Sequence, residues 1–402
     1  MPIVFVHGVN TRKGPAYDAG ILVIDAFVRK YLSKATIGGR VLARPVTTFP
    51  YWGDLGMRFA YNMASLPRPQ MQALGGTADA VMQSVLGHVR DAFPALPADN
   101  PLTALARKRL PLAVDVINHL ALQAVAPGDE QAVAAFVVAA SAYAEANPQP
   151  AWLAQVHSDQ DLLNQLAVHV QPPAGVQALG GFGTVFNRIK VSAVKLSQAV
   201  KGAAGKAIDK AGDFASTKLL ASSRDALNET LGRFFGDVFI YLSSRGDKAN
   251  PGKIPALILD ACDTARAAAP DEPLIVMGHS LGGVISMDVL SHFRPEMDVD
   301  LFVTVGSQVA HFEEMKLYRA SDPAIGAPGK ARTPANIKRW INIFDEVDVF
   351  SYSVDRVFDR VDVDAPYDTQ TYTIKAHGAY LEQDRFYQRL RARIDGLDAV
   401  NP

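Results

Sequence analysis

The sequence predicts an α/β fold with a mainly parallel sheet, flanked by helices and interrupted by a large helical insertion. The chain opens with an apolar run, Ile3–Val6, that predicts a buried strand and precedes a helical pattern. A second apolar run, Leu274–Met277, leads through a glycine-rich turn into an apolar helix. Between these regions, residues 55–231 show helical patterns without strand–helix alternation. Alternating strands and helices are typical of a parallel sheet covered on both faces.

The first elements follow from their periodicity. Apolar residues recur at helical spacing over about Ala16–Lys34, which predicts a helix. A second strand is expected over about Val41–Phe49. After Tyr51–Asp54 the alternation stops, and no antiparallel strand precedes Ile3–Val6. We therefore expect a minimal, mainly parallel sheet.

The alternation resumes near the end of the insertion. Three successive elements resume it: the apolar segment Phe234–Leu242, a helix over about Ile254–Ala268, and the strand at Leu274–Met277. The predicted division is a core of residues 1–54 and 232–402 and an all-helical cap or lid of residues 55–231. The insertion begins after a strand, at the edge of the sheet where ligands bind in open α/β folds. We expect a lid that gates a pocket; a cap that only adds stability is the alternative.

The most informative motif is the G-x-S-x-G pentapeptide Gly278–Gly282, extended by Gly283. A strand precedes it and a helix follows it, which is the context that a nucleophile elbow requires. Glycines permit the tight turn, which would present the Ser280 hydroxyl above the sheet. The N–H groups at the start of the following helix would face a developing anion. Ser280 is therefore the predicted nucleophile.

A serine nucleophile needs a histidine base and an acid. After a nucleophile elbow, these groups follow along the chain in the order serine, acid, histidine. Three histidines lie downstream of Ser280: His292, His311 and His377. His292 lies about three turns along the helix that leaves the turn and would point away. His311 precedes every acid candidate. His377, expected at the end of a strand, is the predicted base, with a surface-loop histidine as the alternative interpretation.

The acid is expected in the segment that follows the strand beginning at Trp340. Asp345, Glu346 and Asp348 all stand near the end of this strand. One of them would orient the imidazole of the base and stabilise the imidazolium that forms when the base takes the serine proton. The residues alone leave the choice open.

These motifs together resemble the α/β-hydrolase superfamily and, within it, its lipase-like branch. The resemblance covers the two core segments and not the middle of the chain. It departs from the family pattern at Gln308, where a proline is usual. The matching stretches are Ile3–Asn10 (strand and His-Gly loop), Gly278–Gly283 (elbow), Val303–Ser307 (the T-x-G-S strand), Trp340–Tyr352 (strand and acid loop) and His377–Tyr380 (H-x-x-Y).

The resemblance implies roles for individual residues. An Asn six residues before the catalytic Asp matches Asn342 and Asp348, so Asp348 is the preferred acid and Asp345 the alternative. The backbone N–H groups of Val9 and Leu281 would form the oxyanion hole. His7 would then be structural.

The implied function is a serine carboxylic-ester hydrolase acting on acyl esters through an acyl-enzyme. A lipase or phospholipase is the first expectation, because the predicted cap is rich in Ala, Leu and Val. A short-chain esterase or thioesterase is the second. A hydrolase-fold binding or effector module, with secondary catalysis, belongs to another class. An intact Ser-Asp-His set argues against a module without activity.

Composition limits the alternatives. Forty basic and forty-one acidic residues leave almost no net charge, which does not favour nucleic-acid binding. The single cysteine, Cys262, excludes an internal disulfide and suits a reducing compartment. No leader precedes the first strand, so we expect a cytoplasmic protein, with leaderless secretion as the alternative. The longest apolar stretch, around Ala132–Ala144, is too short for a transmembrane segment.

Two further features bear on partners. Residues 186–218 combine seven basic residues with an Ala/Val stripe at helical spacing, which suits peripheral contact with an anionic membrane. A solvated helix packed on the cap is the alternative. No metal is expected, because no histidine pair has the spacing of a zinc helix and one cysteine cannot build a zinc site. No cofactor is expected either: no glycine-rich phosphate loop follows a strand.

Overall fold

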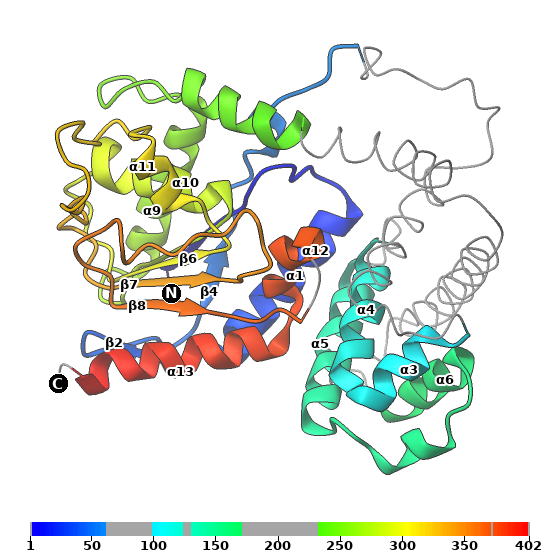
Figure 1. The fold of residues 1–402 in the computed structure, drawn as a ribbon. Coiled ribbons are helices and arrows are strands. Elements are labelled where there is room, and N and C mark those ends of the chain that lie inside the picture. The colour runs from blue at the N-terminus through cyan, green and yellow to red at the C-terminus, as the bar shows by residue number, and fades with distance from the viewer. Residues whose placement is uncertain (1, 62–98, 124–129, 171–231, 371–372, 401–402) are drawn as a thin grey trace. The chain divides into compact units, whose positions relative to one another are not determined.

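The computed structural model describes residues 2–61, 99–123, 130–170, 232–370 and 373–400 (Figure 1). The chain divides into two compact units. The core unit comprises Met1–Lys13, Ile24–Met57 and Phe234–Pro402. The second unit comprises Gly14–Val23 and Arg58–Arg233.

The core unit is built on a six-stranded sheet in which every strand pair is parallel. This confirms the predicted α/β class with a mainly parallel sheet. Val6 of the first strand lies opposite Gly278, and His279 lies opposite Val305, so the strands end at a common edge. The strands, in spatial order, are β4 (Val46–Thr48), β1 (Pro2–Val6), β5 (Ile275–His279), β6 (Leu301–Val305), β7 (Trp340–Phe344) and β8 (Val363–Pro366).

Burial explains the sequence pattern of these strands. β1 and β6 are buried along their whole length, and parallel strands covered on both faces are continuous apolar runs. The outermost strands, β4 and β8, are short and partly exposed, and β8 ends in Pro366. Short strands and proline at a sheet edge discourage pairing with other chains.

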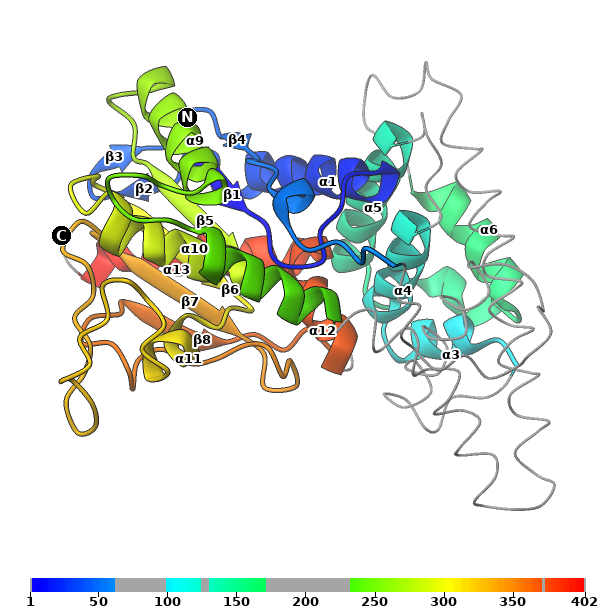
Figure 2. The same ribbon diagram turned by 90° about the horizontal axis from the view of Figure 1, so that it is seen from above.

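Helices cover both faces of the sheet. α9 (Lys253–Ala268), α10 (Leu281–Asp288) and α11 (Val309–Glu314) lie on one face, and α13 (Asp384–Val400) lies on the other (Figures 1 and 2). The second half of α1 (Pro15–Leu32) packs on α13, with the Phe27 and Tyr387 ring centroids 5.2 Å apart. A single π-helical turn, Val289–Phe293, continues α10.

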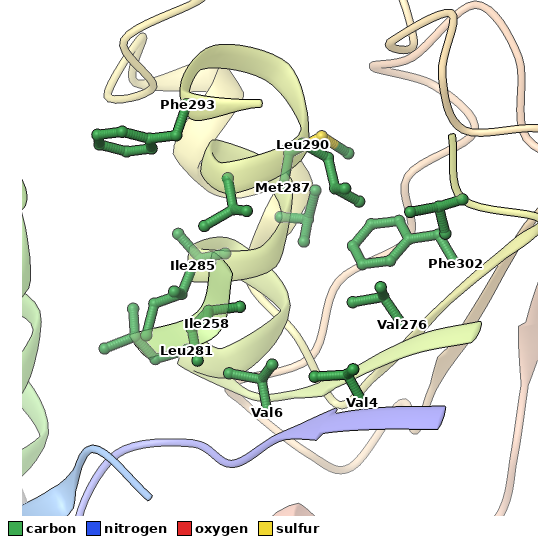
Figure 3. Packing of buried hydrophobic residues seen from close by; sticks show 14 of the residues in the cluster. Val4, Val6, Ile258, Val276, Leu281, Ile285, Met287, Leu290, Phe293 and Phe302 are labelled. Atoms are coloured by element: carbon green, nitrogen blue, oxygen red, sulfur yellow. The ribbon is translucent and has the colours of Figure 1, made fainter. Parts of the chain in front are cut away.

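The core between β1, β5, α9 and α10 is formed by closely packed aliphatic side chains (Figure 3). Val4 and Val6 point from β1 toward the helices that carry Leu281 and Ile258, and all four side chains are fully buried. Burial of each such Leu or Ile side chain contributes about 1.5–3 kcal/mol to folding. This packing fixes the start of α10 against the ends of β1 and β5.

Three predicted elements differ from the structure. The expected strand Val41–Phe49 is divided between β3 (Arg40–Val41), which pairs with β2 (Thr36–Ile37), and β4. The segment Phe234–Leu242, where the strand–helix alternation was expected to resume, lies in a helix of residues 232–244. A short apolar run does not by itself distinguish a strand from a buried helix segment. His377 lies in a short helix, α12 (Thr373–Ala379), and not at the end of a strand. A one-turn 3-10 helix, Tyr380–Glu382, follows it.

The described part of the second unit beyond α1 is helical, as the pattern of residues 99–170 predicts. Buried hydrogen bonds join its helices: Asn118 Nδ2 donates to Ser141 Oγ, and Thr103 donates through its N–H and hydroxyl to Asp159. Ser158 caps the last of these helices by accepting from the Asp161 N–H. The elements are α3 (Pro101–Lys108), α4 (Leu110–Gln123), α5 (Glu130–Ala146), a 3-10 helix (Ala151–Gln155) and α6 (Asp159–His169).

Among the described residues, no helix has the length and apolar character needed to cross a membrane.

Candidate active site

Ser280 occupies a sharp turn between β5 and α10. Its backbone has φ 54° and ψ −131°, a combination that residues other than glycine rarely adopt. Such strain persists only where the surroundings hold it, and it is concentrated at functional sites. Here the Ser280 N–H donates to the Val305 carbonyl, and the Ser307 hydroxyl donates to the Ser280 carbonyl. The neighbouring strand β6 and the segment directly after it therefore hold the serine in place.

The turn also requires close approach of its glycines. A Cβ on Gly278 would lie 2.5 Å from the Cα of Gly283, so neither position has space for a side chain. This contact folds the first turn of α10 back onto the end of β5. The motif of glycines read from the sequence thus has a steric cause in the structure.

The structure brings Ser280, His377 and Asp348 together in one hydrogen-bonded chain. The Ser280 Oγ lies 2.8 Å from His377 Nε2. His377 Nδ1 lies 3.0 and 3.1 Å from the two carboxylate oxygens of Asp348. The hydroxyl therefore donates to Nε2 while Nδ1–H donates to the carboxylate, the arrangement of a nucleophile, a base and an orienting acid.

Asp348 is buried and held by further donors. Its carboxylate accepts from the Phe350 N–H at 2.9 Å and from the Tyr380 hydroxyl at 3.1 Å. Burial, with the nearby Asp348 charge, raises the pKa of Tyr380, so its hydroxyl stays protonated and donates. Tyr380 is the tyrosine of the H-x-x-Y motif.

Asp345 has different partners. One carboxylate oxygen accepts from both the N–H and the hydroxyl of Thr369, and the other accepts from the Val347 N–H. These bonds stabilise the loop that carries Asp348. Glu346 is exposed. Of the three candidate acids, the structure places only Asp348 against the His377 ring.

Two amide side chains hold the acid loop: Asn342 from β7, and Gln308 from the segment between β6 and α11. Asn342 Nδ2 donates to the Tyr352 carbonyl at 2.9 Å and to Asp364 at 2.8 Å. Gln308 Nε2 donates to the carbonyl of Phe350. The glutamine that departs from the family pattern thus holds the backbone two residues after Asp348. Sequence reasoning had no signal for this role.

His279, which directly precedes the nucleophile, links the turn to α12. Its Nε2–H donates to the His377 carbonyl at 2.5 Å, and the two ring centroids are 5.0 Å apart. Burial, aided by the nearby His377, lowers the pKa of His279 to about 3. The ring is therefore neutral, with its proton on Nε2. In the G-x-S-x-G pattern this residue is only a variable position, so the sequence carries no signal for this contact.

The loop after β1 lies against Ser280. A Cβ on Gly8 would stand 2.5 Å from Ser280 Cβ and 3.0 Å from Ser280 Oγ. His7 buttresses this loop: its ring stacks on Trp52 with centroids 4.8 Å apart, and its Nε2 accepts from the Trp52 N–H. The indole N–H of Trp52 donates in turn to the His7 carbonyl.

The two expected oxyanion donors lie on the two segments that flank the serine. Leu281 is the first residue of α10, so its N–H has no partner within the helix. Val9 follows Gly8, the residue that faces the serine side chain. The site lies at the switch point of the sheet. The next strand of the sheet after β1 in sequence, β4, lies on one side of it, and β5 lies on the other side. Ligands bind at this point in open α/β sheets.

The remaining sequence predictions concern other parts of the chain. The other two downstream histidines lie elsewhere: His292 is in the π-helical turn, and the His311 ring stacks on Tyr352. Of the three, the structure places His377 against the Ser280 hydroxyl. Residues 186–218, the predicted membrane-contact segment, lie outside the described residues. In the described ranges, no group of three or more His, Cys, Asp or Glu side chains is placed to hold a metal ion.

Comparison of the chain with protein-family models, with curated proteins and with solved structures finds no match.

If Ser280 is the nucleophile of an ester hydrolase, as the sequence predicts, Gly8→Ala is expected to lower kcat for ester hydrolysis by about 100-fold. The new methyl group would displace either the loop or the Ser280 side chain. Michaelis kinetics on a p-nitrophenyl ester would measure this. Gly326→Ala is the matched control, since a Cβ there meets nothing within 4 Å. A Gly8→Ala enzyme as active as Gly326→Ala would contradict the close approach.

The stability of the core unit is expected to fall as the pH drops from about 6.5 to about 4. Burial lowers the pKa of His7 to about 4, so between these values the unfolded chain binds a proton that the folded chain excludes. A proton added to His7 Nε2 would also point at the Trp52 N–H, which donates a hydrogen bond to this nitrogen in the folded chain. His279 acts in the same direction, down to about pH 3.

Thermal unfolding followed by circular dichroism from pH 7 to pH 4 would measure this decrease. His7→Gln should show a smaller decrease in Tm over that range than the wild type. An equal slope for wild type and His7→Gln would rule out the contribution of His7.

Proposed function

We propose that this protein is a serine hydrolase that cleaves acyl esters through a covalent acyl-enzyme, with an α/β-hydrolase core. The observation that carries the proposal is the hydrogen-bonded chain Ser280–His377–Asp348 on a strained turn at the start of a helix. The nucleophile Ser280, the orienting acid Asp348 and the base His377 follow in this order along the chain, which supports an α/β-hydrolase assignment.

The reaction would begin when Ser280 Oγ attacks the carbonyl carbon of the ester and His377 Nε2 takes the hydroxyl proton. Asp348 would stabilise the resulting imidazolium, and the N–H groups of Val9 and Leu281 would bind the oxyanion. Collapse of the tetrahedral intermediate would break the ester C–O bond, with the proton passing from His377 to the leaving alcohol. Water, activated by His377, would then release the acid and restore Ser280.

The preferred substrate class is a lipid ester or phospholipid. Apolar side chains adjoin the base: the Phe350 ring meets His377 edge-on with centroids 5.3 Å apart, and it stacks on Phe234 at 4.4 Å. Val347 and Val349, on either side of Asp348, are exposed. These residues would favour an acyl chain over a polar substituent. A short-chain ester or thioester is the second candidate within the same chemistry.

Fluorophosphonate labelling of the purified protein, with the labelled peptide identified by mass spectrometry, tests the proposal. Labelling at Ser280 in the wild type and its loss in Ser280→Ala is the expected result. The experiment is repeated in the presence of detergent and of liposomes. Absence of labelling under all these conditions would favour a binding or effector module instead.

A further inference from the structure

A buried carboxylate outside the Ser-His-Asp chain gathers four hydrogen bonds. Asp237 lies in the helix of residues 232–244, and its side chain is fully buried. One oxygen accepts from the Met57 N–H at 2.7 Å and from Arg12 at 2.8 Å. The other accepts from the Asn10 N–H at 2.8 Å and from Arg12 at 3.2 Å. Its charge is thus compensated by the guanidinium and by two backbone donors.

Two of these partners belong to the loop that faces the nucleophile. Asn10 directly follows Val9, and its φ of 57° places it in the left-handed region, where a residue other than glycine needs support. Arg12 also donates to the carbonyls of Thr11 and Met57. The carboxylate of Asp237 therefore holds the backbone immediately after Val9 in a conformation that is otherwise unfavourable.

The other partners mark where the chain leaves and re-enters the core unit. Met57 is the last residue of the core unit before the long segment Arg58–Arg233 of the second unit, and the chain returns at Phe234, three residues before Asp237. A Cβ on Gly56 would lie 2.4 Å from the Asp237 carboxylate, so the chain passes close to it here. One carboxylate thus connects both junctions with the loop beside Ser280.

We propose that Asp237, paired with Arg12, is a positioning residue that sets the Val9 N–H as an oxyanion donor. The inference rests on the proposed hydrolase function and names a residue outside its triad. Because the same carboxylate binds the Met57 N–H, the donor position depends on both junctions of the insertion. A displacement of either junction would be transmitted to the oxyanion loop through these hydrogen bonds.

Asp237→Asn tests the proposal with little change in shape. An amide offers one oxygen and one NH2 group, so two of the four donors would face another donor and lose their acceptor. The Asn10 loop would relax. We expect kcat for a p-nitrophenyl ester to fall about 10- to 100-fold, less than the full loss of one oxyanion donor. KM is expected to stay within about threefold, because the donor acts on the transition state.

A boronic acid gives a second readout, since it forms a tetrahedral adduct on serine. Its inhibition constant should rise by the same factor as kcat/KM falls, whereas a merely structural loss would not couple the two. Arg12→Lys keeps the charge but not the two-point contact, and should cause a smaller decrease of the same kind. It also decides the question if Asp237→Asn does not fold.

Asp288→Asn is the matched control. Asp288 is equally buried in the core unit and accepts from Arg245, Tyr241 and the Arg319 N–H. The Asp288→Asn variant should lose thermal stability while keeping the wild-type kcat. If the wild type does not label with fluorophosphonate, the hydrolase proposal fails. Suppose instead that the wild type is active. If the folded variant, Asp237→Asn or Arg12→Lys, then keeps the wild-type kcat or changes only KM, the positioning role fails.

Discussion

Ser280→Ala is expected to lower kcat for acyl-ester hydrolysis by about four to six powers of ten. In the proposed mechanism the hydroxyl is the attacking group, and its Oγ lies 2.8 Å from the nitrogen that would take its proton. Without Oγ, the reaction would depend on the oxyanion donors and substrate binding alone, which leave only a small residual acceleration. The measurement is a kcat determination on a p-nitrophenyl ester, with the enzyme concentration fixed by fluorophosphonate titration of the wild type.

Ser286→Ala is a suitable control for this substitution. Ser286 is buried on the same helix, and its hydroxyl donates to the Gly282 carbonyl at 2.7 Å. Its loss should affect stability far more than kcat. A Ser280→Ala enzyme that retains more than about a hundredth of wild-type kcat would show that another group is the nucleophile.

Asp348→Asn is expected to lower kcat by about three to four powers of ten. An asparagine amide would offer its NH2 group to His377 Nδ1 and favour the tautomer with the proton on Nε2. That tautomer cannot accept the Ser280 proton. The loss of the negative charge would also leave the imidazolium without its partner. The same ester assay, read between pH 6 and pH 9, would measure this effect.

Asp345→Asn provides the comparison that separates the two acids. Asp345 bonds Thr369 and the Val347 N–H, so its loss should lower Tm and reduce kcat by no more than about tenfold. A large decrease for Asp345→Asn beside a small one for Asp348→Asn would assign the acid role to Asp345 and refute the assignment made here.

The central strands could be predicted because each is a continuous apolar run. β1, β5, β6 and β7 are covered on both faces, so their burial is visible in the local sequence. The segment Phe234–Leu242 was predicted wrongly for a related reason. Its apolar residues include Phe235 and Phe239, which are exposed on one side of a helix, whereas Tyr241 is buried on another. An apolar run alone does not show which of its faces are covered.

The candidate site divides in the same way. The turn at Ser280 depends on neighbours in sequence, since Gly278 and Gly283 must touch for the chain to reverse. The selection of Asp348 over Asp345 depends on which carboxylate reaches a histidine 29 residues further along the chain. Spacing alone left both acids open, and only the family resemblance favoured Asp348.

The amino-acid sequence by itself determined the parallel strands, the serine turn and the order of the chemical groups, because local sterics and burial govern these features. The tertiary structure decided the partners: Asp348 for His377, the His377 carbonyl for His279, and Asp237 for the loop after Val9. These contacts join residues up to 227 positions apart. Each depends on how whole elements pack, so a buried carboxylate finds its donors only when the fold brings them together.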